Sequence, residues 1–104
     1  MSLATIADQE VHVDDEGFMT DYEEWNEGLA RQLAANIGIE LGDRHMEAIR
    51  FLREDFKTEG ETATLRRVTT MSGIPTKELF QLFPKKPAKK MAYIAGLPKP
   101  AGCV

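Results

Sequence analysis

The sequence predicts a small, mainly α-helical bundle with an N-terminal β-hairpin and a flexible C-terminal arm. In five segments the apolar residues recur every three or four positions, which is the spacing of one face of an α-helix. A short stretch before residue 20 alternates at period two instead, which favours a pair of strands. The chain ends in LPKPAGCV, over residues 97–104, and its prolines and glycine stop a helix from continuing.

Length and composition limit the number of domains. The chain has 104 residues, of which 42% are hydrophobic, and this is enough apolar surface for one modest core. We therefore expect residues 1–96 to form a single helical domain and residues 97–104 to form a mobile C-terminal arm.

The first predicted element is a β-hairpin over about residues 4–19. Residues 5–7 and 11–13 alternate between apolar and polar side chains on either side of a polar turn at Asp8-Gln9. A two-stranded hairpin is marginally stable by itself. We expect it to pack against the helices.

A helix is expected to follow, from Thr20 to near Gly38. Thr20 and Glu23 fit a capping box, in which the two side chains satisfy backbone N–H groups at a helix start. The expected buried face steps by three, four and four residues, through Tyr22, Trp25, Leu29 and Leu33.

Four further helices are predicted over residues 43–57, 62–72, 75–83 and 87–94. Asp43 is a candidate cap for the first of them, and Pro87 suits the first turn of the last. The expected buried side chains of these helices are Met46, Ile49, Leu52, Phe56, Leu65, Val68, Met71, Leu79, Phe80, Leu82, Phe83, Met91, Tyr93 and Ile94.

Charge is unevenly distributed along the chain. Residues 1–61 hold 16 acidic residues and five Lys or Arg, whereas residues 62–104 hold eight Lys or Arg and one acidic residue. Two interpretations are open: the halves attract each other in the fold, or the basic half meets an acidic partner, an anion or RNA. No apolar run approaches the roughly 20 residues of a membrane span, and no signal-peptide pattern is present. We expect a cytoplasmic protein with no membrane contact.

Few residues are arranged for metal binding or catalysis. His12, His45 and Cys103 show no metal-ligand spacing, so we expect no metal and no cofactor. Residues 65–80 are typical of a helix-turn-helix, and a nucleic-acid-binding regulator is therefore an alternative function. The chain's isoelectric point near 5.2 disfavours it, because DNA binding relies on basic residues.

The single cysteine, Cys103, is the residue before the last. One cysteine forms no intramolecular disulfide. Seven residues separate it from Gly96, and at about 3.1 Å per residue a proline-stiffened chain of that length spans roughly 20 Å. The thiol is thus placed to enter a partner's cleft, where its thiolate form can act as a nucleophile or sulfur carrier.

Four stretches of the chain resemble the DsrC/TusE family of small cytoplasmic sulfur-relay proteins, once described as the gamma subunit of dissimilatory sulfite reductase. They are VDDEGFMTDYEEWNEGLA (13–30), HMEAIRFLREDF (45–56), TATLRRV (62–68) and LFQLFPKKPAKKMAYIAGLPKPAGCV (79–104). The resemblance implies an orthogonal helical bundle with an N-terminal hairpin and a mobile arm. It also implies that Cys103 carries sulfur as a persulfide.

One position departs from part of this family. Members of the DsrC type have a second arm cysteine eleven residues before the last one, and this chain has Ala92 there. The departure implies a relay with one thiol, as in TusE-like delivery of sulfur for tRNA 2-thiouridine or in sulfur oxidation by DsrC-like paralogues.

The resemblance also implies supporting residues and partners. Arg66, Lys89 and Lys99 match basic positions of the family and are candidates to hold the arm or its anionic sulfur. The expected partners are an upstream persulfide donor protein and a downstream acceptor, with an indirect link to tRNA. A non-catalytic subunit of a sulfite reductase-like complex is a further alternative.

Overall fold

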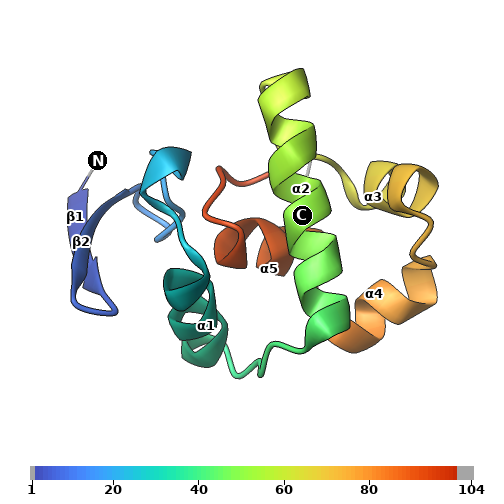
Figure 1. Ribbon diagram of the computed structural model, residues 1–104, viewed down its shortest axis with the longest axis horizontal. Coiled ribbons are helices and arrows are strands. Elements are labelled where there is room, and N and C mark those ends of the chain that lie inside the picture. Colours follow the sequence, from blue (N-terminus) through green and yellow to red (C-terminus); the bar gives the residue numbers. More distant parts are fainter. Residues whose placement is uncertain (1, 101–104) are drawn as a thin grey trace.

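The computed structural model describes residues 2–100 as a helical bundle with one hairpin (Figure 1). The bundle measures 34 × 27 × 23 Å. Within residues 2–100, its five α-helices and its two-stranded antiparallel hairpin confirm the predicted mainly α-helical bundle with an N-terminal hairpin. Its elements are β1 (Ser2–Ile6), β2 (Gln9–Val13), the 3₁₀ helix η1 (Tyr22–Glu24), α1 (Glu27–Asn36), α2 (Asp43–Glu59), α3 (Leu65–Ser72), α4 (Thr76–Leu82) and α5 (Pro87–Ile94).

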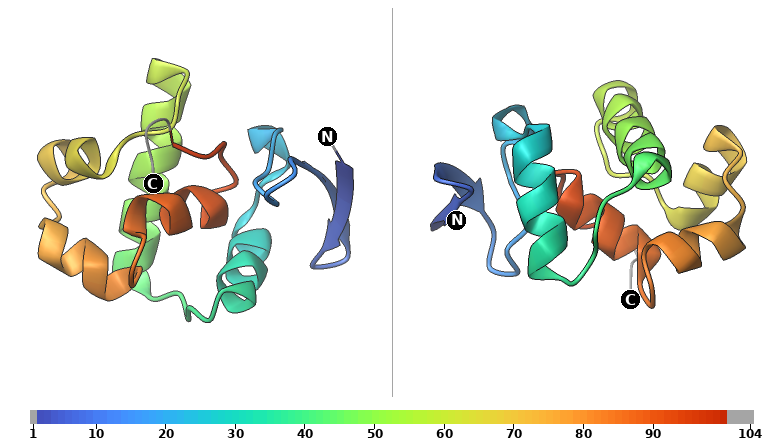
Figure 2. Two further views of the ribbon diagram at one scale, coloured as in Figure 1. Left: turned by 180° about the vertical axis from the view of Figure 1, so that it is seen from behind. Right: turned by 60° about the horizontal axis from the view of Figure 1, so that its bottom comes forward.

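Helix α5 lies at the centre of the bundle. It packs against α1, α2 and α4, and the views from behind and from below show these helices around it (Figure 2). Four of its eight residues are buried. The main core surrounds this helix, and its larger side chains are Phe18, Ile49, Leu52, Val68, Ile74, Leu79, Phe83, Met91, Ile94 and Leu97.

A second apolar cluster lies between the hairpin and α1. It consists of Val11, Val13, Met19, Leu29 and Leu33. Trp25 and Tyr93 pack against this cluster and against the main core. The hairpin is therefore attached to the bundle through apolar contacts, as its marginal stability alone requires.

The hairpin turn lies one residue earlier than expected, at Ala7-Asp8. Both residues have positive φ, 51° and 62°, which suits a two-residue turn between twisted antiparallel strands. Ile6 pairs with Gln9, and this register places Val11 and Val13 on the inner face. A slip of one residue would turn both valines to solvent, so burial of the valines decides the register.

The expected helix from Thr20 to Gly38 is wrong in its first turns. Asp21, not Thr20, caps the short η1 helix, and its side chain accepts from the Glu23 N–H. The chain then becomes extended at Trp25, and α1 begins at Glu27 with Asn26 as its cap. The break allows the Trp25 indole to reach the Ile94 carbonyl, 69 residues away along the chain.

Helix α2 starts at Asp43, as expected, but its cap differs, and α3 starts later than expected. The N-cap of α2 is Gly42 rather than Asp43, and its N–H donates to His45 Nδ1 over 3.0 Å. Helix α3 starts at Leu65 with the Thr64 hydroxyl as its cap. Thr62 is therefore outside α3, and its hydroxyl donates to the Pro98 carbonyl instead.

Two residues expected to be buried are exposed. Met71 on α3 is 58% exposed and Phe80 on α4 is 45% exposed. Val68 and Leu79 already fill the buried faces of these short helices. A helix of seven or eight residues buries only one narrow face. The periodic pattern therefore predicted more buried side chains on these two helices than the structure has.

Candidate functional site

The described part of the C-terminal segment leaves α5 through a compact helix end. Gly96 has φ +70°. The Gly96 N–H bonds to the Tyr93 carbonyl and the Leu97 N–H to the Ala92 carbonyl, over 3.3 and 3.0 Å. These two bonds define a Schellman motif, in which the residue after the glycine returns to the helix. Leu97 accordingly has no exposed surface.

Two side chains from other elements bind the last carbonyls of α5. Trp25 Nε1 donates to the Ile94 carbonyl over 2.8 Å. Arg53 donates to the Ala95 carbonyl over 2.7 Å and to the Tyr22 carbonyl over 2.8 Å. A cation at a helix C-terminus is favourable because the helix dipole is negative there. The helix end is thus held from η1 and α2 at once.

Arg53 is also enclosed by aromatic rings. Its guanidinium lies 4.2 Å from the Trp25 ring centroid and 4.9 Å from that of Tyr22, in the range of cation–π contacts. Burial lowers the pKa of the Arg53 guanidinium, yet an arginine remains charged at neutral pH. Its charge is therefore available to the α5 carbonyls.

The next residues of the segment also contact the body. The Pro98 carbonyl accepts from the Thr62 hydroxyl over 2.7 Å. Lys99 Nζ lies 3.3 Å from Glu16 Oε1, and Pro100 is buried. Residues 97–100 therefore lie against the bundle. These contacts do not test two of the predictions. One is the mobile arm over residues 97–104, and the other is the end of the domain at residue 96.

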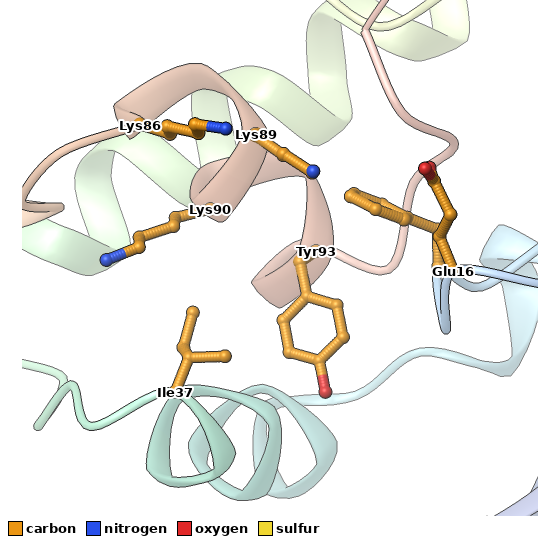
Figure 3. Close-up of a pocket in the computed structure, with 7 residues that line it drawn as sticks. Glu16, Ile37, Lys86, Lys89, Lys90 and Tyr93 are labelled. Atoms are coloured by element: carbon orange, nitrogen blue, oxygen red, sulfur yellow. The ribbon is translucent and has the colours of Figure 1, made fainter. Parts of the chain in front are cut away.

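A pocket of about 390 Å³ opens beside α5, and we name it the lysine pocket (Figure 3). Its lining residues are Glu16, Phe18, Ile37, Lys86, Lys89, Lys90 and Tyr93. Asp14 Oδ1 accepts from the N–H groups of Glu16 and Phe18 over 2.9 and 3.0 Å. This turn holds the loop that carries two of the lining residues.

The structure brings two of the three predicted supporting residues to one place. Lys89 lines the lysine pocket with Glu16, and Lys99 pairs with the same Glu16. Arg66 is exposed on α3 and lines a different, smaller hollow of about 250 Å³. Cys103 lies outside the residues that the structure describes.

Sequence reasoning missed the residues that hold the segment. Arg53, Trp25 and Thr62 each bond to a carbonyl between residues 94 and 98. Their partners are 36 to 69 residues away in the chain, so no local pattern links them. The one local signal was Gly96 directly after a helical pattern, which is typical of a capped helix end.

Within residues 2–100, the structure groups no three His, Cys, Asp or Glu side chains as a metal site. Among the helices that it describes, none is both long and apolar enough to cross a bilayer.

Comparison with known proteins identifies the family. The model of the family described as DsrC-like protein matches residues 5–104. The chain belongs to the DsrC-like family. The sulfurtransferase TusE of Escherichia coli K12 is 40% identical to this DsrC-like chain over 104 residues, covering 92% of the chain and 94% of TusE. TusE of Salmonella typhimurium shows the same identity and the same coverage.

Solved structures agree with this assignment. The DsrC of Allochromatium vinosum superposes on this DsrC-like chain with a TM-score of 0.84 at 32% identity, covering 98% of the chain and 97% of that protein. The oxidized gamma-subunit of the dissimilatory sulfite reductase from Archaeoglobus fulgidus, also named DsrC, gives 0.79 at 33% identity, with coverage of 99% and 100%. The helices and the hairpin that the structure describes are thus shared with these DsrC proteins.

Proposed function

We propose that this sulfur-relay protein carries sulfur as a persulfide on Cys103 and transfers it between two partner proteins. The observation that supports this most directly is that the family match extends to residue 104 and so includes Cys103, the only cysteine of the chain. The 40% identity to sulfurtransferase TusE supports the same chemistry.

The proposed transfer is an exchange without net oxidation or reduction. The Cys103 thiolate attacks the outer sulfur of a donor persulfide, R–S–SH. The donor S–S bond breaks, an S–S bond forms on Cys103, and the donor leaves as a thiolate, R–S⁻. The Cys103 persulfide then gives its outer sulfur to an acceptor thiolate in the same way. Each step conserves the sulfur atom and its proton.

The body of the protein positions the carrier in this proposal. Residues 94–99 contact Trp25, Arg53, Thr62 and Glu16, so the base of the segment that leads to Cys103 is held against the bundle. While residues 97–100 keep these contacts, the three residues from Pro100 to Cys103 span at most about 10 Å. A reach of about 20 Å requires Leu97 and Lys99 to leave the body.

Intact-mass measurement tests the proposal. The full chain is incubated with sodium polysulfide or with a low-molecular-weight persulfide, and we expect a gain of one sulfur atom that a thiol reductant removes. Cys103→Ser is the matched control and should gain none. The absence of a gain in the wild type, or an equal gain in the variant, would overturn the proposal.

The acceptor decides the pathway. Because Ala92 leaves Cys103 without a second thiol in the chain, the proposal predicts transfer to a partner rather than closure of an internal disulfide. The two routes expected from the family are tRNA 2-thiouridine formation and sulfur oxidation. Transfer of ³⁵S from loaded Cys103 to purified acceptors of each route distinguishes them.

A second candidate function is that of a non-catalytic subunit. It is favoured by the similarity to the protein named as a gamma-subunit of dissimilatory sulfite reductase. In that case, co-purification with a reductase complex should be the same for wild type and Cys103→Ser. If the protein is a sulfur carrier, sulfur transfer should instead stop in Cys103→Ser.

A further inference from the structure

We propose that the lysine pocket docks an acidic segment of a partner protein, with one apolar side chain of that segment seated inside the pocket. The proposal depends on the proposed function only for the partner's role as sulfur donor or acceptor. The docking itself uses no thiol.

The interior of the pocket suits an apolar side chain. Phe18, Ile37 and Tyr93 line it, and the Phe18 and Tyr93 rings meet edge to face with centroids 5.9 Å apart. Figure 3 shows Ile37 and Tyr93 on one side of the pocket and the lysines on the other. The volume of about 390 Å³ lies at the lower end of the range for ligand pockets, which is room for one large side chain and its neighbours.

The rim of the pocket is basic. Lys86, Lys89 and Lys90 lie at the start of α5, and that helix has no acidic residue in its first turn. Among the residues that the structure describes, none of these three lysines pairs with a carboxylate within 4.0 Å. Cations are unfavourable at a helix N-terminus because the dipole is positive there. Carboxylates of a bound segment would neutralise both the lysines and the helix end.

The charges farther from the pocket favour a protein segment over a nucleic acid. Glu16 is on the rim, and residues 1–61 hold 16 acidic residues. A nucleic acid carries a negative charge at every nucleotide, so its neighbouring phosphates would meet this acidic half. A peptide places its carboxylates only where the lysines lie and offers an apolar anchor as well.

The pocket adjoins the segment that leads to Cys103. Glu16 lines the pocket and also pairs with Lys99. A partner docked at the lysines therefore lies beside residues 97–100. Its carboxylates compete with Glu16 for Lys99, which would free one of the contacts that hold this segment on the body.

A peptide selection tests the docking. A random dodecapeptide library on phage is selected against the full chain carrying Cys103→Ser, and enriched peptides are synthesised with a fluorescent label. We expect enriched peptides to contain Asp or Glu flanking one Leu, Phe or Met. Charge reversal in Lys89→Glu and Lys90→Glu should each weaken binding by at least about tenfold. Lys77→Glu, an exposed lysine on α4, is the matched control and should change the Kd by less than about twofold.

Two further measurements complete the test. Replacing the apolar anchor of a selected peptide by Ser should weaken binding at least about fivefold, since the apolar contact is lost. Polyuridylate at the same phosphate concentration should not displace the peptide. No enrichment, no acidic bias, unchanged binding to both lysine variants, or displacement by polyuridylate would each overturn the proposal. None of these results depends on sulfur transfer, so the failure of one proposal is distinguishable from the failure of the other.

Discussion

Among the glycines of residues 2–100, Gly96 leaves the least room for a side chain. It has φ +70°, and a Cβ there would lie 2.5 Å from Trp25 Cδ1. Trp25 cannot move aside easily, because its indole bonds to the Ile94 carbonyl and stacks on Arg53. Gly96→Ala therefore combines a left-handed backbone with a clash against a fixed ring.

Gly73 supplies the matched control for this substitution. It also ends a helix with positive φ, +81°, but a Cβ there would meet nothing within 4 Å. We expect Gly73→Ala to lower the free energy of unfolding by about 1 kcal/mol through φ alone. Gly96→Ala should cost about 1–3 kcal/mol more because of overpacking. Urea unfolding followed by circular dichroism measures both, and equal losses would show that the Trp25 contact does not constrain the helix end.

At the scale of elements, η1 connects the hairpin to the bundle through Glu24. Its carboxylate accepts from the His12 N–H and contacts His12 Nδ1, both over 2.9 Å. Its carbonyl accepts from Gln9 Nε2 over 2.8 Å. The backbone N–H of His12, followed by the imidazole, lowers the pKa of Glu24.

The lowered pKa predicts a pH dependence of hairpin attachment. The folded state favours the ionised Glu24, so its contribution is complete above the ordinary glutamate pKa of about 4.3. It is lost as the pH falls through the lower folded pKa. We expect amide exchange in β2, corrected for intrinsic rates, to accelerate below about pH 4. Glu24→Gln should weaken this dependence, whereas the neighbouring exposed Glu23→Gln should keep it. The same pH dependence in both variants would contradict this role.

The elements show how far the sequence could predict the fold. The helix expected over residues 87–94 matches α5, because the signals at its two ends act within one turn of the chain. The Thr20 capping box was locally sound and still wrong, since Trp25 bonds to a carbonyl 69 residues away. Met71 and Phe80 had the right spacing for burial but are exposed. The spacing of apolar residues does not show how much of a helix surface the neighbouring elements cover.

The sequence likewise predicted single residues of the candidate site but not the contacts between them. Lys89 and Lys99 were identified as single basic positions, but Glu16, which relates them, is 83 residues from Lys99. Arg53 gave no local signal, because an arginine that binds a distant helix end resembles a solvated surface arginine in sequence.

At the scale of the whole molecule, residues 2–100 form two apolar clusters, and two further side chains pack against both. Trp25 and Tyr93 pack against both the main core and the cluster under the hairpin. Two clusters with no shared side chain could unfold separately. Shared aromatic side chains couple them, because loss of either cluster exposes the same large rings.

We therefore expect the bundle to unfold in one cooperative step. Methyl NMR signals of Val11, in the hairpin cluster, and Val68, in the main core, should disappear at the same urea midpoint. Leu33→Ala removes a fully buried side chain of the hairpin cluster and should cost about 2–5 kcal/mol. If the chain is one domain, this substitution lowers both midpoints equally. A lower midpoint for Val11 alone would show that the hairpin and α1 fold as a separate unit, and that Trp25 and Tyr93 do not couple the clusters.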